Sequence, residues 1–120
     1  MVDADGIILG SPVYNANISA NMQALLERAS VITDMNKGLL KHKVGAAVAA
    51  ARRGGALNTL DAINHFFLLQ DMFIVGSSYW NMAYGRLPAE VEQDEEGIET
   101  MKNLGTNMAY LLNAMKGENK

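Results

Sequence analysis

Three short apolar runs, each followed by a stretch with helical spacing, constrain the fold of this chain most strongly. The runs lie near residues 6–11, 43–51 and 72–76, and the helical stretches near 19–36, 56–69 and 94–116. Short continuous apolar runs are typical of strands buried on both faces of a parallel sheet. Because parallel strands are joined by right-handed helical crossovers, the alternation predicts an α/β protein with helices on both faces of the sheet.

The middle run, residues 43–51, is rich in alanine and would suit a helix by propensity alone. Its place between two helical patterns, together with Gly45, favours a central strand instead. Sheets usually contain about five or six strands, whereas this chain offers about three. The sequence therefore predicts one partial domain over residues 1–120, with a truncated sheet.

The ends of the predicted helices carry recognisable signals. Ser19 is a suitable N-cap for the first helix, and acidic residues from Asp94 to Glu96 favour the start of the last one. Residues 77–93 lie between the third run and this helix, are rich in aromatic side chains and show no period. A connection of this length in a small domain is usually functional or disordered.

Composition excludes several classes of function. The chain has 10 Lys and Arg against 13 Asp and Glu, without a long basic run, so a nucleic-acid partner is not expected. It has no cysteine, which excludes disulfides, thiolate catalysis and iron-sulfur ligation by its own residues. No apolar stretch approaches the roughly 20 residues that cross a bilayer, and the first residues lack the features of a signal peptide. We therefore expect a cytoplasmic protein without a membrane partner.

Ligands of open α/β sheets bind at the carboxyl ends of the strands, which here are followed by residues 11–19, 51–57 and 77–86. These loops contain glycines, amides, aromatic rings and arginines, a mixture that suits a planar polar aromatic molecule. The side chains concerned are Asn15, Asn17, Tyr14, Tyr79, Trp80, Tyr84, Arg52, Arg53 and Arg86. Two alternatives stay open: the arginines could be solvated, and the aromatic residues of 79–84 could form a subunit contact, which is the favoured interpretation.

Two segments of the chain carry a resemblance to a known family. Residues 4–14, Ala-Asp-Gly-Ile-Ile-Leu-Gly-Ser-Pro-Val-Tyr, are followed by Ile-Ser-Ala-Asn-Met-Gln-Ala-Leu-Leu-Glu-Arg at 18–28. Together they resemble the signature of the NADPH-dependent FMN reductase superfamily. The resemblance extends over nearly the whole chain and is strongest to the iron-sulfur flavoprotein and multimeric flavodoxin branch.

This resemblance implies a three-layer, flavodoxin-like fold and an FMN-dependent oxidoreductase. Electrons would pass from NAD(P)H through the flavin to an acceptor such as a quinone or another flavin. Because the flavin carries the chemistry, no catalytic side chain and no metal ligand is expected. The resemblance assigns the flavin to two loops of this chain, with the residues Ser11, Pro12, Val13, Tyr14, Asn15, Arg53, Gly54 and Gly55.

The sequence also departs from the family pattern. Family members begin with a strand, a Ser- and Gly-rich phosphate loop, a helix and a second strand, and this chain starts after them. We therefore expect FMN binding to be weak or dependent on a partner. The first strand should lie exposed at the sheet edge and pair two or more copies into a homo-oligomer. The alternative is a truncated, non-catalytic oligomerising module that does not bind FMN.

Overall fold

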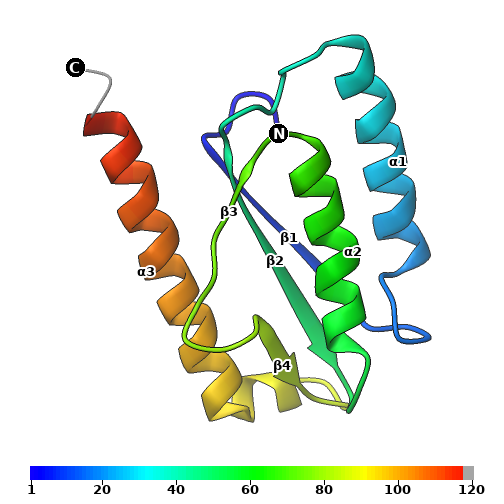
Figure 1. Ribbon diagram of the computed structural model, residues 1–120. Helices are drawn as coiled ribbons and strands as arrows, with labels where there is room; N and C mark the ends of the chain where they lie inside the picture. Colours follow the sequence, from blue (N-terminus) through cyan, green and yellow to red (C-terminus); the bar gives the residue numbers. More distant parts are fainter. Residues whose placement is uncertain (118–120) are drawn as a thin grey trace.

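The central strand β2 (Val44–Ala51) organises the sheet. In the computed structural model, which describes residues 1–117, β2 pairs in parallel with β1 (Gly6–Pro12) on one side. On its other side it pairs in parallel with β3 (Phe73–Ile74) and, further along, with β4 (Met82–Tyr84). The four strands thus form three rows, with β1 at one edge (Figure 1). The predicted parallel α/β sheet is confirmed.

Helices cover both faces of this sheet, as predicted. The crossover helices α1 (Ala20–Met35) and α2 (Ala56–Leu69) lie on one face, and α3 (Glu95–Gly117) lies on the other (Figure 1). The short 3₁₀ helix η1 (Glu90–Gln93) precedes α3. Ser19 caps α1 through its side chain, which accepts a hydrogen bond from the Met22 backbone N–H.

The third row of the sheet differs from the sequence prediction. Only Phe73 and Ile74 of the run at 72–76 form a strand, and the segment 77–93 contains β4 and η1. The prediction of an irregular connection was therefore wrong for part of that segment. β4 has only three residues, which is too short for a strand period to be visible in the sequence. Its pairing with β2 is what defines it as a strand.

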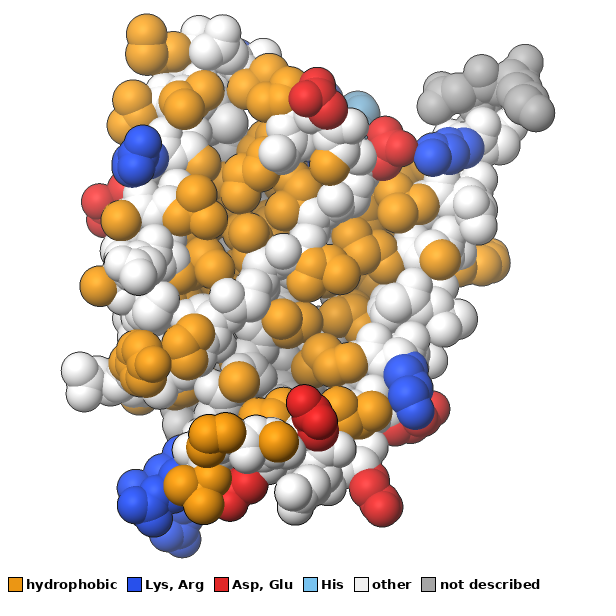
Figure 2. Space-filling model, turned by 180° about the vertical axis from the view of Figure 1, so that it is seen from behind, with side chains coloured by type: hydrophobic (Ala, Val, Ile, Leu, Met, Phe, Trp, Pro, Cys, Tyr) orange, Lys and Arg blue, Asp and Glu red, His pale blue; other side chains and the backbone are white. Residues whose placement is uncertain are grey.

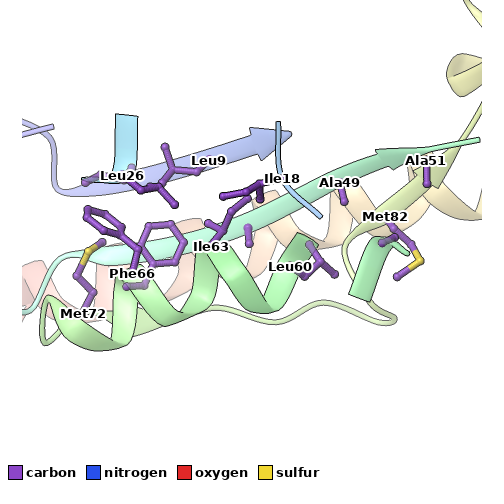
Figure 3. Packing of buried hydrophobic residues seen from close by; sticks show 14 of the residues in the cluster. Leu9, Ile18, Leu26, Ala49, Ala51, Leu60, Ile63, Phe66, Met72 and Met82 are labelled. Atoms are coloured by element: carbon purple, nitrogen blue, oxygen red, sulfur yellow. The ribbon is translucent and has the colours of Figure 1, made fainter. Parts of the chain in front are cut away.

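The larger core lies between the sheet and the helices α1 and α2 (Figure 3). Ile7 and Leu9 of β1 point into it, together with Ile63 and Phe67 of α2, which have no exposed surface. The small residues of β2 make room for this packing: a Cβ atom at Gly45 would lie 2.9 Å from the Phe67 ring. The alanine-rich sequence of β2 is therefore a packing requirement and not a helix signal.

The opposite face is covered only in part. Leu104 and Met108 of α3 pack on Val44 and Ala46 of β2, and Met108 also lies against Gly6 of β1, but the described part of the chain leaves the rest of the outward side of β1 uncovered. Ile8 is 54% exposed there, whereas its neighbours Ile7 and Leu9 are buried on the other face. Figure 2 shows hydrophobic side chains spread over this face beside α3. The predicted exposed edge therefore presents one large apolar side chain of the 7–9 segment, not all three.

Candidate functional site

The carboxyl ends of β1, β2 and β4 bring three loops together at one edge of the sheet, which lies at the bottom of Figure 1, and the segment from β3 to β4 runs down to the same edge. Residues 13–19 follow β1, residues 52–55 follow β2, and residues 85–89 follow β4, while residues 75–81 join β3 to β4. This edge is the place where open parallel sheets bind their ligands.

A tight reverse turn shapes the loop after β1. Tyr14 and Asn17 exchange backbone hydrogen bonds of 3.0 Å in both directions. The two residues between them have positive φ, 50° at Asn15 and 58° at Ala16, as a type I′ turn requires. The turn carries the Tyr14 ring, which is 63% exposed. The loop therefore presents an aromatic side chain on a rigid backbone.

Ser11 fixes the two ends of this loop to each other. Its side chain is buried, and its Oγ accepts a hydrogen bond of 2.9 Å from the Ser19 backbone N–H. The same hydroxyl donates to the carbonyl oxygen of Pro12 at 2.8 Å. The observed contacts of the Ser11 side chain are thus to the loop itself.

The loop after β2 packs against the turn. Gly55, the N-cap of α2, has a φ of 86°, which favours glycine. A Cβ atom there would lie 2.6 Å from the Ala16 Cα and 3.2 Å from the Val13 Cγ1. The structure thus brings the two predicted flavin loops into contact, and only a residue without a side chain fits between them.

Most of the predicted site residues lie at this junction with accessible surface. Pro12, Tyr14, Asn15, Arg53 and Gly54 are exposed, Val13 and Gly55 are half-buried, and Ser11 is buried. Nothing lies within 4 Å of the position of a Cβ atom at Gly54, so this backbone is open to close approach. Their assignment to a flavin stays a prediction.

A hollow lies next to the Gly55 junction. Its volume is about 350 Å³, within the usual range of small-molecule sites. It is lined by Gly55, Ala56, Leu57, Asn58, Tyr79, Trp80, Met82 and Tyr84. The Tyr79 and Trp80 rings meet edge to face, with their centroids 4.9 Å apart. Sequence reasoning named the three aromatic side chains but missed Met82, because it did not find β4.

The electrostatics of this region come from backbone groups and arginines. No side chain caps the first turn of α2, whose residues Ala56 to Asn58 line the hollow. Free N–H groups and the helix dipole favour an electronegative ligand atom at such a position. Arg52 and Arg53 are exposed beside it, and none of the residues that line the hollow is acidic.

The carboxylates of Asp94 and Glu90, in the neighbouring segment, accept backbone hydrogen bonds and do not line the hollow. Asp94 accepts hydrogen bonds from the backbone N–H groups of Tyr84 at 2.7 Å and Gly97 at 3.0 Å, which ties β4 to the start of α3. Glu90 accepts backbone hydrogen bonds from Leu87 at 2.9 Å and Arg86 at 2.6 Å. These two donors hold the pKa of Glu90 below its usual value.

Comparison with known proteins places these loops in a family. A sequence model described as NADPH-dependent FMN reductase matches residues 1–86, which include both contacting loops. The chain belongs to this family. The part of it that the structure describes has no helix of the length and apolarity needed to cross a membrane.

Similar proteins include iron-sulfur flavoproteins of archaea. One from Methanocaldococcus jannaschii is 38% identical over 123 residues, which cover 97% of this chain and 63% of the relative. Another, from Methanosarcina thermophila, is 35% identical and is matched over 56% of its length. An NAD(P)H dehydrogenase (quinone) from Acidithiobacillus ferrooxidans is 32% identical over 66% of this chain. The chain thus spans less than two thirds of the length of these relatives.

A solved structure shares the fold of this chain. The flavodoxin, WrbA-like protein from Agrobacterium tumefaciens superposes with a TM-score of 0.79, at 23% sequence identity. The match covers 93% of this chain and 68% of that protein. The three-layer arrangement is therefore flavodoxin-like, as predicted.

The residues present fit the ring of FMN, the cofactor that the family implies. The fit rests on the open backbone at Gly54, the uncapped first turn of α2 and the neighbouring hollow with its aromatic walls. A planar ring with polar edges can stack on such walls and accept hydrogen bonds from such backbone groups.

Proposed function

We propose that this chain is the ring-binding part of an FMN-dependent oxidoreductase that takes electrons from NAD(P)H. The observation that carries the proposal is the contact between Gly55 and Ala16, which joins the two loops assigned to the flavin. The family membership supports the cofactor, and the quinone dehydrogenase relative supports the reaction type. The acceptor of the electrons is a quinone or another flavin in this proposal.

Each loop has a separate task in the proposed site. Pro12, Val13 and Tyr14 would lie along the isoalloxazine ring and shield one side of it from water. The backbone at Gly54 and the first turn of α2 would donate hydrogen bonds to the polar edge, where Arg53 would favour negative charge. When bound, FMN would supply the two-electron chemistry between a nicotinamide and the acceptor. The protein would position the ring and its reaction partners.

The free edge of β1 supports a role for a partner. Beside this edge lies an almost wholly apolar hollow of about 360 Å³, lined by Gly10, Ser11, Pro12, Val48, Ala49, Ala50, Ala83, Val91 and Met101. A strand with an unpaired edge and an open apolar flank is a template for pairing. We propose that a second copy pairs with β1, and that flavin binding is stronger in this assembly than in the single chain.

Titration with two flavins tests the ring site. FMN and riboflavin differ only in the phosphate, so a site built from these loops alone binds both with similar affinity, observed as quenching of flavin fluorescence. Tyr14→Ala should weaken both by about tenfold, because aromatic stacking is worth on the order of 1 kcal/mol. Tyr110→Ala, which removes another mostly exposed tyrosine ring, on α3, serves as the matched control.

Absence of binding of both flavins to an assembled protein would contradict the ring site. Light scattering measures the assembly itself and should give a mass above that of one chain. Ile8→Lys should reduce this mass toward a single chain, since it places a charge on the free strand. A single-chain mass for the unmodified protein would contradict pairing through β1. An assembly that binds no flavin would instead favour the alternative function, a non-catalytic oligomerising module.

A further inference from the structure

Two arginines at the ligand edge have no part in the site described above. Arg52 follows β2 and Arg86 follows β4, and both side chains are exposed. The chain has four arginines, of which Arg53 is assigned to the polar edge of the flavin and Arg28 lies on α1. Three of the four arginines therefore lie in two loops at one end of the sheet.

Strand pairing brings these two loops together. Ala51 is the register partner of Tyr84, and the Gly85 N–H donates a hydrogen bond of 2.9 Å to the Ala51 carbonyl. Arg52 comes directly after Ala51, and Arg86 comes directly after Gly85. Figure 2 shows basic side chains gathered at the bottom of the molecule, which is the end at which β2 and β4 finish in Figure 1.

The charges of these arginines are not used inside the protein. Within residues 1–117 every ion pair involves a lysine, and no arginine side chain donates a hydrogen bond. The Glu90 carboxylate accepts from the backbone N–H of Arg86, not from its side chain. A guanidinium group matches a phosphate group, because it can donate two parallel hydrogen bonds to it. Both side chains are therefore available to an anionic ligand.

The two arginines border the hollow beside Gly55. The lining of this hollow includes Gly55, which follows Arg52 in the same loop, and Tyr84, which precedes Arg86. A nicotinamide that passes a hydride to a flavin ring has to lie in contact with that ring. The remainder of the nucleotide then extends over the rim of the hollow, where positive charge favours its phosphate groups.

We propose that Arg52 and Arg86 bind phosphate groups of the nicotinamide nucleotide and thereby set its affinity. This inference rests on the proposed function, which supplies the nucleotide as electron donor. The group they recognise is a phosphate, either the diphosphate that NADH and NADPH share or the 2′-phosphate that only NADPH carries. The two arginines are binding residues and take no part in the transfer of the hydride.

Trp80 reports binding without flavin present. It is the single tryptophan of the chain, and it lines the hollow. Its segment is held at Asn81, whose Nδ2 donates to the Ala47 carbonyl at 3.1 Å, and at Ser77, whose Oγ donates to the Thr100 carbonyl at 2.6 Å. Because reduced nicotinamide absorbs light where tryptophan emits, a nucleotide bound in the hollow quenches the emission of Trp80.

The test compares NADPH and NADH with reduced nicotinamide riboside, which has the same ring but no phosphate. Arg52→Gln combined with Arg86→Gln should weaken the binding of a dinucleotide about tenfold, as expected for two exposed charged contacts, and leave the riboside unchanged. Added salt should weaken dinucleotide binding more in the unmodified protein than in this double variant. Arg28→Gln is the matched control, because it removes an exposed arginine of α1.

The pattern of losses identifies the phosphate. A loss for both dinucleotides assigns the arginines to the diphosphate, and a loss for NADPH alone assigns them to the 2′-phosphate. Unchanged dinucleotide affinity in the double variant, or an equal loss for the riboside, would overturn the inference and leave the proposed function standing. If none of the three nucleotides binds, both the inference and the choice of NAD(P)H as donor are wrong. Urea unfolding checks that the double variant is as stable as the unmodified protein.

Discussion

The two faces of the sheet are covered to different extents. On one face α1 and α2 enclose a core with fully buried residues such as Ile63 and Phe67. On the other, α3 covers β2, while Ile8 of β1 lies exposed beside an apolar hollow. The first face has a closed core within this chain, and the second leaves part of β1 open to another segment. The difference separates residues that hold this chain together from residues available to a partner.

The largest effect is expected from substitutions that compare these faces directly. Phe67→Ala should destabilise the protein by about 3–5 kcal/mol, because the ring is fully buried and its removal leaves a cavity. Ile8→Ala should change stability by no more than about 0.5 kcal/mol, since this side chain loses little buried surface. Urea unfolding of both variants measures the contrast. Similar losses would show that the outer side of β1 is already covered in solution.

A smaller effect should come from the loop contact on the α1 and α2 side. Gly55→Ala should cost about 2 kcal/mol, because alanine disfavours the positive φ and its Cβ would overlap with Ala16. It should also weaken flavin binding, since it separates the two loops. Gly105→Ala is the control, because it lies on α3 outside the two loops and has open space around the new methyl group. Equal flavin binding by both variants would argue against the junction as the ring site.

On the other face, the side chain of Asp94 links β4 to the start of α3. Asp94→Ala should cost about 1–2 kcal/mol, because it removes the cap of α3 together with the bond to the Tyr84 N–H. Hydrogen exchange should show the loss as faster exchange in the first turns of α3, with little change in α2. Glu96→Ala, which removes a nearby exposed carboxylate, should leave the exchange of α3 almost unchanged.

The smallest expected effect concerns pH and the segment that leads into α3. The pKa of Glu90 is lowered in the folded protein by the N–H groups of Leu87 and Arg86. The Glu90 carboxylate therefore binds a proton more readily in the unfolded chain than in the folded one. Its two hydrogen bonds stabilise the folded protein above pH 4.5, the ordinary pKa of this group. It is lost as the pH falls through the folded pKa. Glu90→Gln should consequently lower stability at pH 7 but not at pH 3, as urea unfolding at both values would show.

Sequence reasoning located most of the elements for a physical reason. The runs that became β1 and β2 are apolar over their whole length, and the helices repeat their apolar residues every three or four positions. Such patterns arise within a few neighbouring residues. The capping role of Ser19 is of the same kind, because its partner Met22 lies in the next turn.

The candidate site could be predicted only in part. The resemblance pointed to residues 11–15 and 53–55, but the contact between Gly55 and Ala16 depends on the packing of two loops that are far apart in the chain. The hollow lined by Asn64, Tyr79, Trp80 and Asn81 is not predicted by the sequence. The sequence favours a subunit contact for its aromatic residues, and Asn64, an isolated asparagine on a helix, carries no signal of its own.

The sequence alone thus determined the α/β class, the order of the elements, the family and the loops that face the ligand edge. The tertiary structure decided where the third row breaks, which face stays open and which amides become buried. The reason is the range of the interactions. Periodicity and capping act between near neighbours, whereas the bond from Asn81 to Ala47 joins residues 34 positions apart.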